Sequence, residues 1–165
     1  MPLALPNISG PLFTLTPDIL REGCLAAADS PRQRIILPLH RHQDALVQRM
    51  LNFLQPATYI QPHLHPLPHA SETIHVLSGA IGFLIFEDDG TLRSHHLLQA
   101  GGFGFIDIEP NVWHGFIALE PDTVIIEIKR GPYAPQHDKC FASWAPAEGE
   151  SSAPDALHAW RQLFA

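Results

Sequence analysis

The stretch 58-TYIQPHLHPLPHASETIHVLSG-79 decides how this chain folds, because it combines two strand-like runs with three residues that can bind a metal. The runs 58–65 and 72–78 are rich in Thr, Tyr, Ile and Val, side chains that fit a pleated β-surface. His63 and His65 stand two residues apart, and side chains alternate along a strand with a period of two. Both imidazoles are therefore expected on one face of a strand.

Two further residues extend this pair to a complete ligand set. Glu72 opens the second run after the loop 66–71, so a hairpin would bring its carboxylate beside the imidazoles. His114 lies in a later run, entered through the turn Glu109-Pro110-Asn111, and closing a barrel would place that run against the histidine pair. The sequence thus predicts one site with four ligands: His63, His65, Glu72 and His114.

Three imidazoles and one carboxylate suit one divalent transition-metal ion, Fe, Mn, Ni, Co or Zn, and suit neither calcium nor an iron–sulfur cluster. A six-coordinate ion held by four protein groups keeps two positions open, whereas a structural site is normally closed. We therefore expect an ion that can polarise a substrate or activate water or oxygen. Other histidines are expected to be exposed or hydrogen-bonded residues without a metal: His69, His95, His96 and His137.

Outward from this stretch, residues 35–129 continue as short apolar runs separated by turn sequences. The further runs are 80–87, 102–108, 113–119 and 123–129, and a spacing of about ten residues between turns is typical of an antiparallel sandwich or barrel. Thr16-Pro17-Asp18 has the N-cap, first-turn proline and acid of a helix start, which predicts a short helix ending near residue 28. A second short helix is expected at about 154–164, in a tail anchored by Trp144 and Trp160.

The composition predicts one soluble globular domain, since 45% of the 165 residues are hydrophobic and 16% are charged. A formal charge of -7 without a basic patch argues against nucleic-acid binding. No apolar run approaches the ~20 residues of a membrane-spanning helix, and the N-terminal segment lacks the basic start of a secretory signal. We expect a cytoplasmic protein that binds no membrane. Cys24 and Cys140 are expected to be buried and unbridged.

At these residues the sequence resembles the cupin superfamily, whose first motif reads HxH, then Glu, then Gly, and whose second motif ends in a turn and a histidine. The matching residues are His63, His65, Glu72, Gly79 and His114. Six residues separate His65 from Glu72, where the general motif has three or four. Asn111 stands where glycine is common, and Asn tolerates the left-handed conformation better than other non-glycine residues.

More closely, the chain resembles the WbuC family of cupin-fold metalloproteins, in which the longer spacing is normal. The resemblance spans roughly residues 30 to 149, on the segments SPRQR, LHRHQDALVQRMLNFLQPATYIQPHLHP, FEDDG, WHGFIALEP, EIKRGPY and FASWAP. It implies an all-β fold, a cupin-type antiparallel β-barrel (double-stranded β-helix or jelly roll) with a short helix at each end. We divide the chain into an arm and helix (1–33), the barrel (34–130) and a wrapping tail (131–165).

The same stretch offers candidates for the wall of the site. A hairpin loop at 55–58 would pair the run 47–54 with 59–65, and directly opposed residues share a face. A one-residue slip of register would instead turn Arg49 inward, which would favour a carboxylate or phosphate. Tyr59 is the predicted catalytic residue, and Glu127 is a second proton-transfer candidate that is expected mainly to support the structure. Candidate substrate-binding residues are Gln48, Asn52, Gln61 and Phe116, with Ile74 as further apolar wall, although the polar ones could equally satisfy each other in the core.

The leading hypothesis is a metal-dependent enzyme that acts on a small oxygen-rich molecule, a sugar derivative or oxo-acid, by isomerase, lyase or dioxygenase chemistry. The WbuC resemblance implies a setting in bacterial surface-polysaccharide metabolism, without a particular reaction. One alternative is a non-catalytic module that binds a small molecule or metal, and another is a metal-free sugar-nucleotide epimerase. A homodimer is expected, through strand edges and the apolar N-terminal arm.

Overall fold

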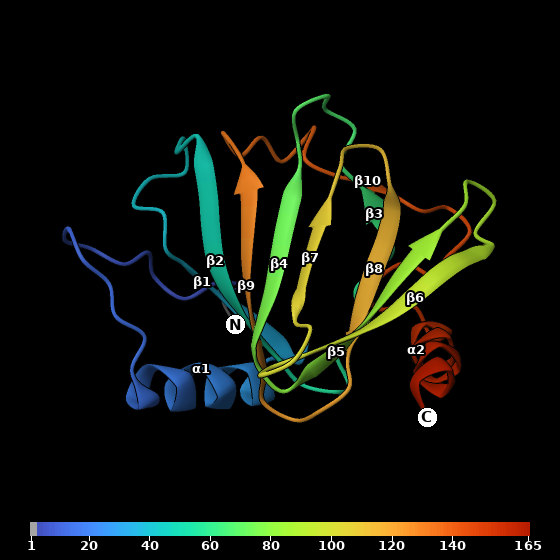
Figure 1. Cartoon of the computed structure of the whole chain (residues 1–165), viewed down its shortest axis with the longest axis horizontal. Helices are drawn as coiled ribbons and strands as arrows, with labels where there is room; N and C mark the ends of the chain where they lie inside the picture. The colour runs from blue at the N-terminus through green and yellow to red at the C-terminus, as the bar shows by residue number, and fades with distance from the viewer. Residues whose placement is uncertain (1–2) are drawn as a thin grey trace.

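Two facing five-stranded antiparallel sheets form the chain's framework in the computed structural model, which describes residues 3–165. The strands curve around a shared interior, with the first sheet on the left of Figure 1 and the second on the right. The predicted all-β antiparallel barrel is therefore confirmed. The first sheet has the order β1 (Arg34–Pro38), β2 (Val47–Leu54), β9 (Thr123–Arg130), β4 (Glu72–Ser78) and β7 (Phe105–Ile108). The second has the order β10 (Cys140–Phe141), β3 (His63–Leu64), β8 (Trp113–Ala118), β5 (Ala80–Phe86) and β6 (Leu92–Gln99).

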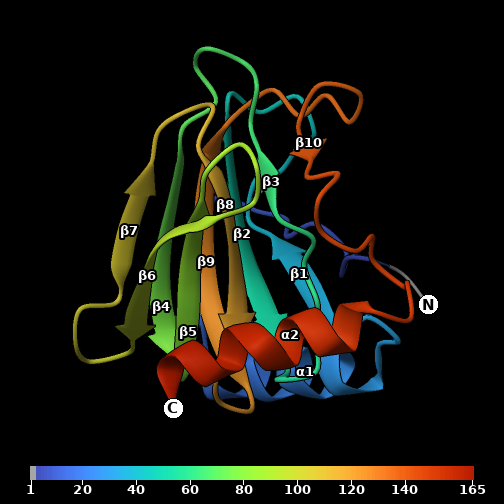
Figure 2. The same cartoon turned by 90° about the vertical axis from the view of Figure 1, so that its right-hand side faces the viewer.

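Both predicted helices are present, at one end of the barrel (Figure 2). The first, α1 (Pro17–Asp29), begins where Thr16 caps it, because the hydroxyl oxygen of Thr16 accepts a hydrogen bond from the Ile19 amide at 3.3 Å. The tail holds α2 (Ala153–Arg161) and a 3-10 turn, η1 (Gln162–Phe164). The loop between β3 and β4 lies at the opposite end of the barrel in both views (Figures 1 and 2).

On β4 and β9 of the first sheet, the side chains that face the barrel interior change from apolar to polar along the strand. On β4 the inward positions read Val76, Ile74 and Glu72, and on β9 Ile125 is followed at alternate positions by Glu127 and Lys129. The apolar part packs against the second sheet in a core that includes Phe83 and Ile81. Because neighbouring strands are in register, the polar positions line up at the end opposite the helices.

The predicted pairing of 47–54 with 59–65 is wrong. β2 pairs instead with β1 and β9, with Asn52 opposite Ile36 and Ile125. Pro56 and Pro62 have no N–H to donate to a ladder, which disfavours a continuous hairpin there. The chain crosses to the second sheet, where only 63–64 of the predicted strand 58–65 remains as β3.

Several smaller expectations can be compared with the structure. Asn111 takes the left-handed conformation, with φ 63°, as expected. Trp144 and Trp160 both pack on Phe86, with ring centroids 4.9 and 5.8 Å away. Cys140 is exposed, so its expected burial is wrong, because it lies on an edge strand of only two residues. Within residues 3–165, no helix is both long and apolar enough to cross a membrane. Met1 and Pro2 of the predicted arm lie outside the described residues.

Replacing Gly23 by Ala should destabilise the fold, although alanine is the better helix former. An added Cβ on Gly23 would stand 2.3 Å from the ring of Phe53, which is fully buried beneath α1. Overpacking should outweigh the gain in helix propensity and lower the free energy of unfolding by about 1–2 kcal/mol. Urea denaturation measures this, with Glu22→Ala, at an exposed position of the same helix, as the control. A Gly23→Ala protein as stable as wild type would contradict the packing.

Candidate metal centre

The four predicted ligands converge inside the barrel. One candidate ligand atom from each residue lies within 4.8 Å of the others, and no member is more than 3% exposed. We call this set the His3Glu cluster: His63, His65, Glu72 and His114. β3 and β8 are paired so that two of the histidines are directly opposite each other. The carboxylate comes from the first residue of β4, in the facing sheet, and not through a paired hairpin as expected.

Each imidazole of the cluster is oriented by a backbone carbonyl. The Nδ1 atoms of His63, His65 and His114 lie 3.1, 2.6 and 2.8 Å from the carbonyl oxygens of Gln61, Asp138 and Val112, respectively. A carbonyl oxygen can only accept, so each Nδ1 must carry the proton and donate it. In the neutral rings the Nε2 lone pairs are then free to bind a metal, the arrangement found around metal-bound histidines.

These lone pairs face a carboxylate. The Nε2 atoms of His65 and His114 lie 3.3 and 3.1 Å from Oε2 of Glu72. Neutral rings protonated on Nδ1 cannot donate a hydrogen bond from Nε2 to that oxygen. The Nε2 lone pairs and the carboxylate oxygen are all acceptors, so they repel one another unless a cation or extra protons lie between them. A divalent transition metal fits this donor set of three nitrogens and one carboxylate.

The titration of the cluster favours the metal-binding forms. Burial, followed by the charge of Lys139, holds the pKa of His63 well below its ordinary value, so its ring stays neutral. Burial alone would raise the pKa of Glu72, but hydrogen bonds from His114 and His65 hold it well below the ordinary value. Those hydrogen bonds need a second proton on each ring, at Nε2, which is the position that a metal ion would take. The cluster therefore offers a carboxylate and a neutral imidazole at neutral pH.

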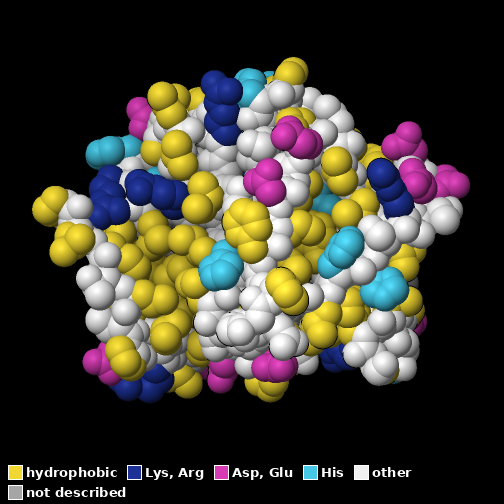
Figure 3. Space-filling view, viewed as in Figure 1, with side chains coloured by type: hydrophobic (Ala, Val, Ile, Leu, Met, Phe, Trp, Pro, Cys, Tyr) yellow, Lys and Arg dark blue, Asp and Glu magenta, His cyan; other side chains and the backbone are white. Residues whose placement is uncertain are grey.

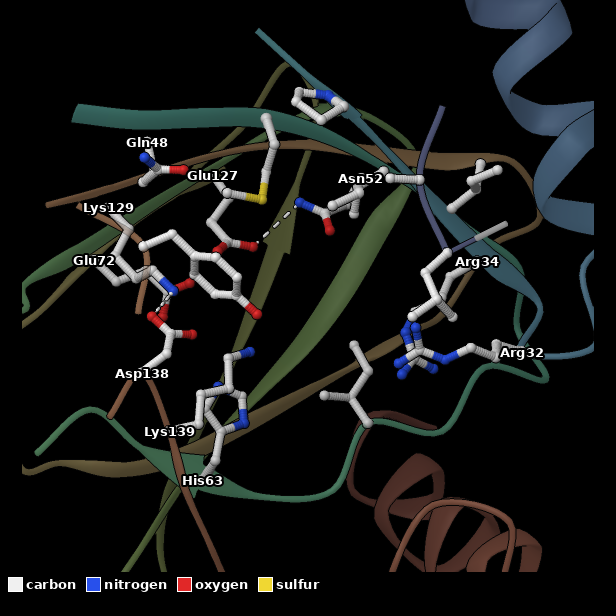
Figure 4. Close-up of a pocket in the computed structure, with 18 of the residues that line it drawn as sticks. Arg32, Arg34, Gln48, Asn52, His63, Glu72, Glu127, Lys129, Asp138 and Lys139 are labelled. Atoms are coloured by element: carbon white, nitrogen blue, oxygen red, sulfur yellow. Dashed lines mark hydrogen bonds and ion pairs between the residues drawn. The ribbon is translucent and has the colours of Figure 1, made fainter. Parts of the chain in front are cut away.

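A cavity of about 400 Å³ adjoins the cluster, with His63 and Glu72 in its wall (Figure 4). The four predicted substrate-binding residues also line it: Gln48, Asn52, Gln61 and Phe116. The amide group of Gln48 donates to the carbonyls of Gln43 and Ala45, and that of Gln61 donates to Ala142. These amides are partly engaged by the backbone, and their role toward a substrate stays a prediction.

Tyr59 does not join the site. Its hydroxyl donates to the carbonyl of Pro146 at 2.7 Å, and its ring stacks on Trp160 at 5.8 Å between centroids. Tyr59 packs in a hydrophobic group under α2. The expected hairpin does not form, and the segment that crosses between the sheets places Tyr59 on the outside of the second sheet. Proton transfer by Tyr59 is therefore not supported. Arg49 is exposed, so the alternative register with Arg49 inward is also wrong.

Two charged residues of β9 belong to the cavity instead. Glu127 is 8% exposed and accepts a hydrogen bond from the Asn52 amide at 3.2 Å. Burial, followed by the neighbouring charge of Glu72, raises the pKa of Glu127 to about 7. Lys129 is 4% exposed and lies 2.5 Å from Asp138. Their signal was present in the sequence, because both follow the inward position of Ile125 at alternate places in an otherwise apolar run.

Solved structures with similar folds identify the fold of this chain. Oxalate oxidase in complex with the substrate analogue glycolate matches with a TM-score of 0.54 and 14% identity, covering 84% of this chain and 75% of that one. A protein from Klebsiella pneumoniae with a double-stranded β-helix domain matches with a TM-score of 0.52 and 19% identity, covering 68% and 82%. KdgF from Halomonas sp. matches with a TM-score of 0.50 and 18% identity, covering 66% and 86%. The fold is thus the cupin, or double-stranded β-helix, fold.

The sequence also places the chain in a family. The model of a family described as a domain of unknown function, DUF6016, matches residues 15–98, and the chain belongs to that family. A comparison with curated proteins finds no match.

Protein purified without chelators should contain about one transition-metal ion per chain, and His114→Ala should lose it. Losing an outer partner of a ligand already costs 10–100-fold in affinity, so losing a ligand should weaken binding by about 100-fold or more. Elemental analysis and competition with a chelating dye measure both effects. His96→Ala, which removes an exposed histidine, is the matched control. Equal metal content in the His114→Ala protein would exclude the cluster as the site.

Glu127→Gln should stabilise the metal-free protein more at pH 8 than at pH 5. A pKa raised from 4.5 to about 7 means that the folded state binds more protons than the unfolded state between these values. Wild-type stability is therefore lost as the pH rises through this window, and the neutral amide avoids that loss. The stability difference between variant and wild type should grow by about 1–3 kcal/mol from pH 5 to pH 8. Urea denaturation at both pH values tests it, with the exposed Glu120→Gln as control.

Proposed function

We propose that the protein is a metal-dependent enzyme that acts on a small oxygen-rich molecule, a sugar derivative or an oxo-acid. The observation that carries the proposal is the His3Glu cluster beside a cavity of about 400 Å³. A metal with only a structural role would normally be closed off by its ligands, whereas this cluster contributes to the wall of a cavity large enough for a small molecule.

The residues around the cavity divide into three roles. The His3Glu cluster would hold the ion, which supplies Lewis-acid or oxygen-activating chemistry when bound. Glu127 lines the cavity, is not a member of the cluster and is oriented by the Asn52 amide, so it is placed to take or give a proton at a bound substrate. Phe116 and Ile60 supply apolar wall that limits water around the substrate.

The finer assignment rests on sequence resemblance. We propose a place among the WbuC cupins, and with it a role in bacterial surface-polysaccharide metabolism. CapF, a capsular polysaccharide assembling protein from Staphylococcus aureus, has a similar fold with a TM-score of 0.55, but at 18% identity that likeness concerns the fold alone. The match covers 64% of this chain and 29% of the CapF chain.

The test is turnover that depends on metal and on Glu127. Chelator should stop turnover of the active compound in a panel of sugars, sugar acids and oxo-acids, and added Fe(II) or Mn(II) should restore it. Glu127→Gln should lower kcat by about 100-fold or more, because it removes the proton carrier, and should leave metal content unchanged. The exposed Glu120→Gln protein is the control. Turnover by metal-free protein would favour the epimerase alternative, and metal binding without turnover across the panel would favour the non-catalytic module.

The expected homodimer stays a prediction, as does the cytoplasmic location. A candidate surface is visible in Figure 3, where hydrophobic side chains gather over the first sheet. Exposed apolar residues on the outer face of this sheet include Val47, Leu77, Phe105 and Ile128.

A further inference from the structure

The charges around the cavity differ in whether they already have a partner. Lys129 is paired with Asp138 at 2.5 Å. Arg32 and Arg34, at the far end of the cavity in Figure 4, both hold the carboxylate of Glu148, with N–O distances of 2.5 Å. These pairs connect the tail to the barrel, and they leave little of this charge free for a ligand.

Lys139 is the exception. It lines the same end of the cavity as His63 (Figure 4), and among residues 3–165 no carboxylate lies within ion-pair distance of its ammonium group. A half-buried, unpaired cation at the wall of a cavity is costly unless water or an anionic ligand compensates it.

The charge balance of the whole cavity favours the same kind of ligand. Its wall carries four acidic and four basic side chains, whose formal charges cancel: Glu72, Glu127, Asp138 and Glu148 against Arg32, Arg34, Lys129 and Lys139. A divalent ion in the cluster would therefore leave a net charge of about +2 in a partly enclosed space. Such a field attracts an anion over a neutral molecule of the same shape.

We infer that the substrate is a small carboxylate, such as a sugar acid or a hydroxy- or oxo-acid, and that Lys139 binds its carboxylate beside the metal. This inference rests on the proposed function, because the metal supplies the remaining positive charge. It narrows the substrate class from oxygen-rich molecules in general to anionic ones. Lys139 acts as a specificity-determining residue, while the ion and Glu127 act on the rest of the molecule.

Two pairs of compounds that differ mainly in charge test the inference. Gluconate and sorbitol share a polyol chain, and lactate and lactamide share a three-carbon skeleton, but only the first member of each pair is an anion. Calorimetric titration of the Mn(II)-loaded protein should show at least one acid binding about tenfold or more tightly than its neutral partner. Metal content is measured after each titration, so that loss of the ion to the ligand is detected.

Variants of Lys139 then test whether this residue causes the preference for the acid over its neutral partner. Lys139→Met keeps the length of the side chain without its charge and should remove most of the preference for the acid, whereas Lys139→Arg should retain it. Arg93→Met removes one positive charge from an exposed position outside the cavity and should leave the preference unchanged. Metal content should be equal in all of these proteins.

The outcomes separate the inference from the proposed function. Metal bound at one ion per chain, with no preference for either acid or with the preference intact in Lys139→Met, would overturn the inference and leave the metal-dependent enzyme standing. A wild-type protein that binds no metal would overturn both. Preference for the acid that falls in Lys139→Met and returns in Lys139→Arg would support both.

Discussion

The orientation of three imidazole rings by backbone carbonyls is the constraint on which the site depends. Each ring donates a hydrogen bond from Nδ1 to a carbonyl oxygen, with Nδ1–O distances of 2.6 to 3.1 Å. Each ring therefore presents Nε2 to the interior. Three lone pairs and the Glu72 carboxylate then face each other in a buried space. The arrangement is electrostatically unfavourable without positive charge, and this is the physical basis for assigning a metal to it.

The barrel makes this arrangement possible because its apolar core and its polar site lie at opposite ends of the interior. The end nearer the helices is filled by apolar side chains such as Phe83, Ile81 and Ile125, which are fully buried and supply the hydrophobic stabilisation. At the other end, β4 and β9 carry inward polar residues, among them Glu72 and Glu127. The polar residues are therefore held on rigid strands, which fixes their geometry better than loops would.

The tail contributes to the site although it contains little regular structure. The carbonyl of Asp138 orients His65, the carboxylate of Asp138 pairs with Lys129, and Glu148 holds Arg32 and Arg34. The tail also supplies Lys139 to the cavity wall. Loss of the tail would therefore remove one ring-orienting contact and two of the four acidic side chains in the cavity wall, so the barrel and its tail act as one unit.

Local sequence patterns were enough to predict which runs form strands and which four residues form the ligand set. The HxH spacing, Glu72 at the head of a strand and His114 after a turn were enough to predict the members of the cluster, because side-chain alternation and the types of ligand atom are local properties. Gln48 and Asn52 were also predicted to face the site, but from a hairpin pairing that the structure shows to be wrong.

Which strands are neighbours could be learned only from the folded chain. Tyr59 lies outside the site because its segment crosses between the sheets. Glu72 approaches the imidazoles from the facing sheet, across the barrel interior, and not along a hairpin. Lys139 and Asp138 were found at the cavity only once the tail was placed. The physical reason is that pairing between strands, and the docking of an irregular tail, depend on contacts between residues far apart in the chain, which no local pattern encodes.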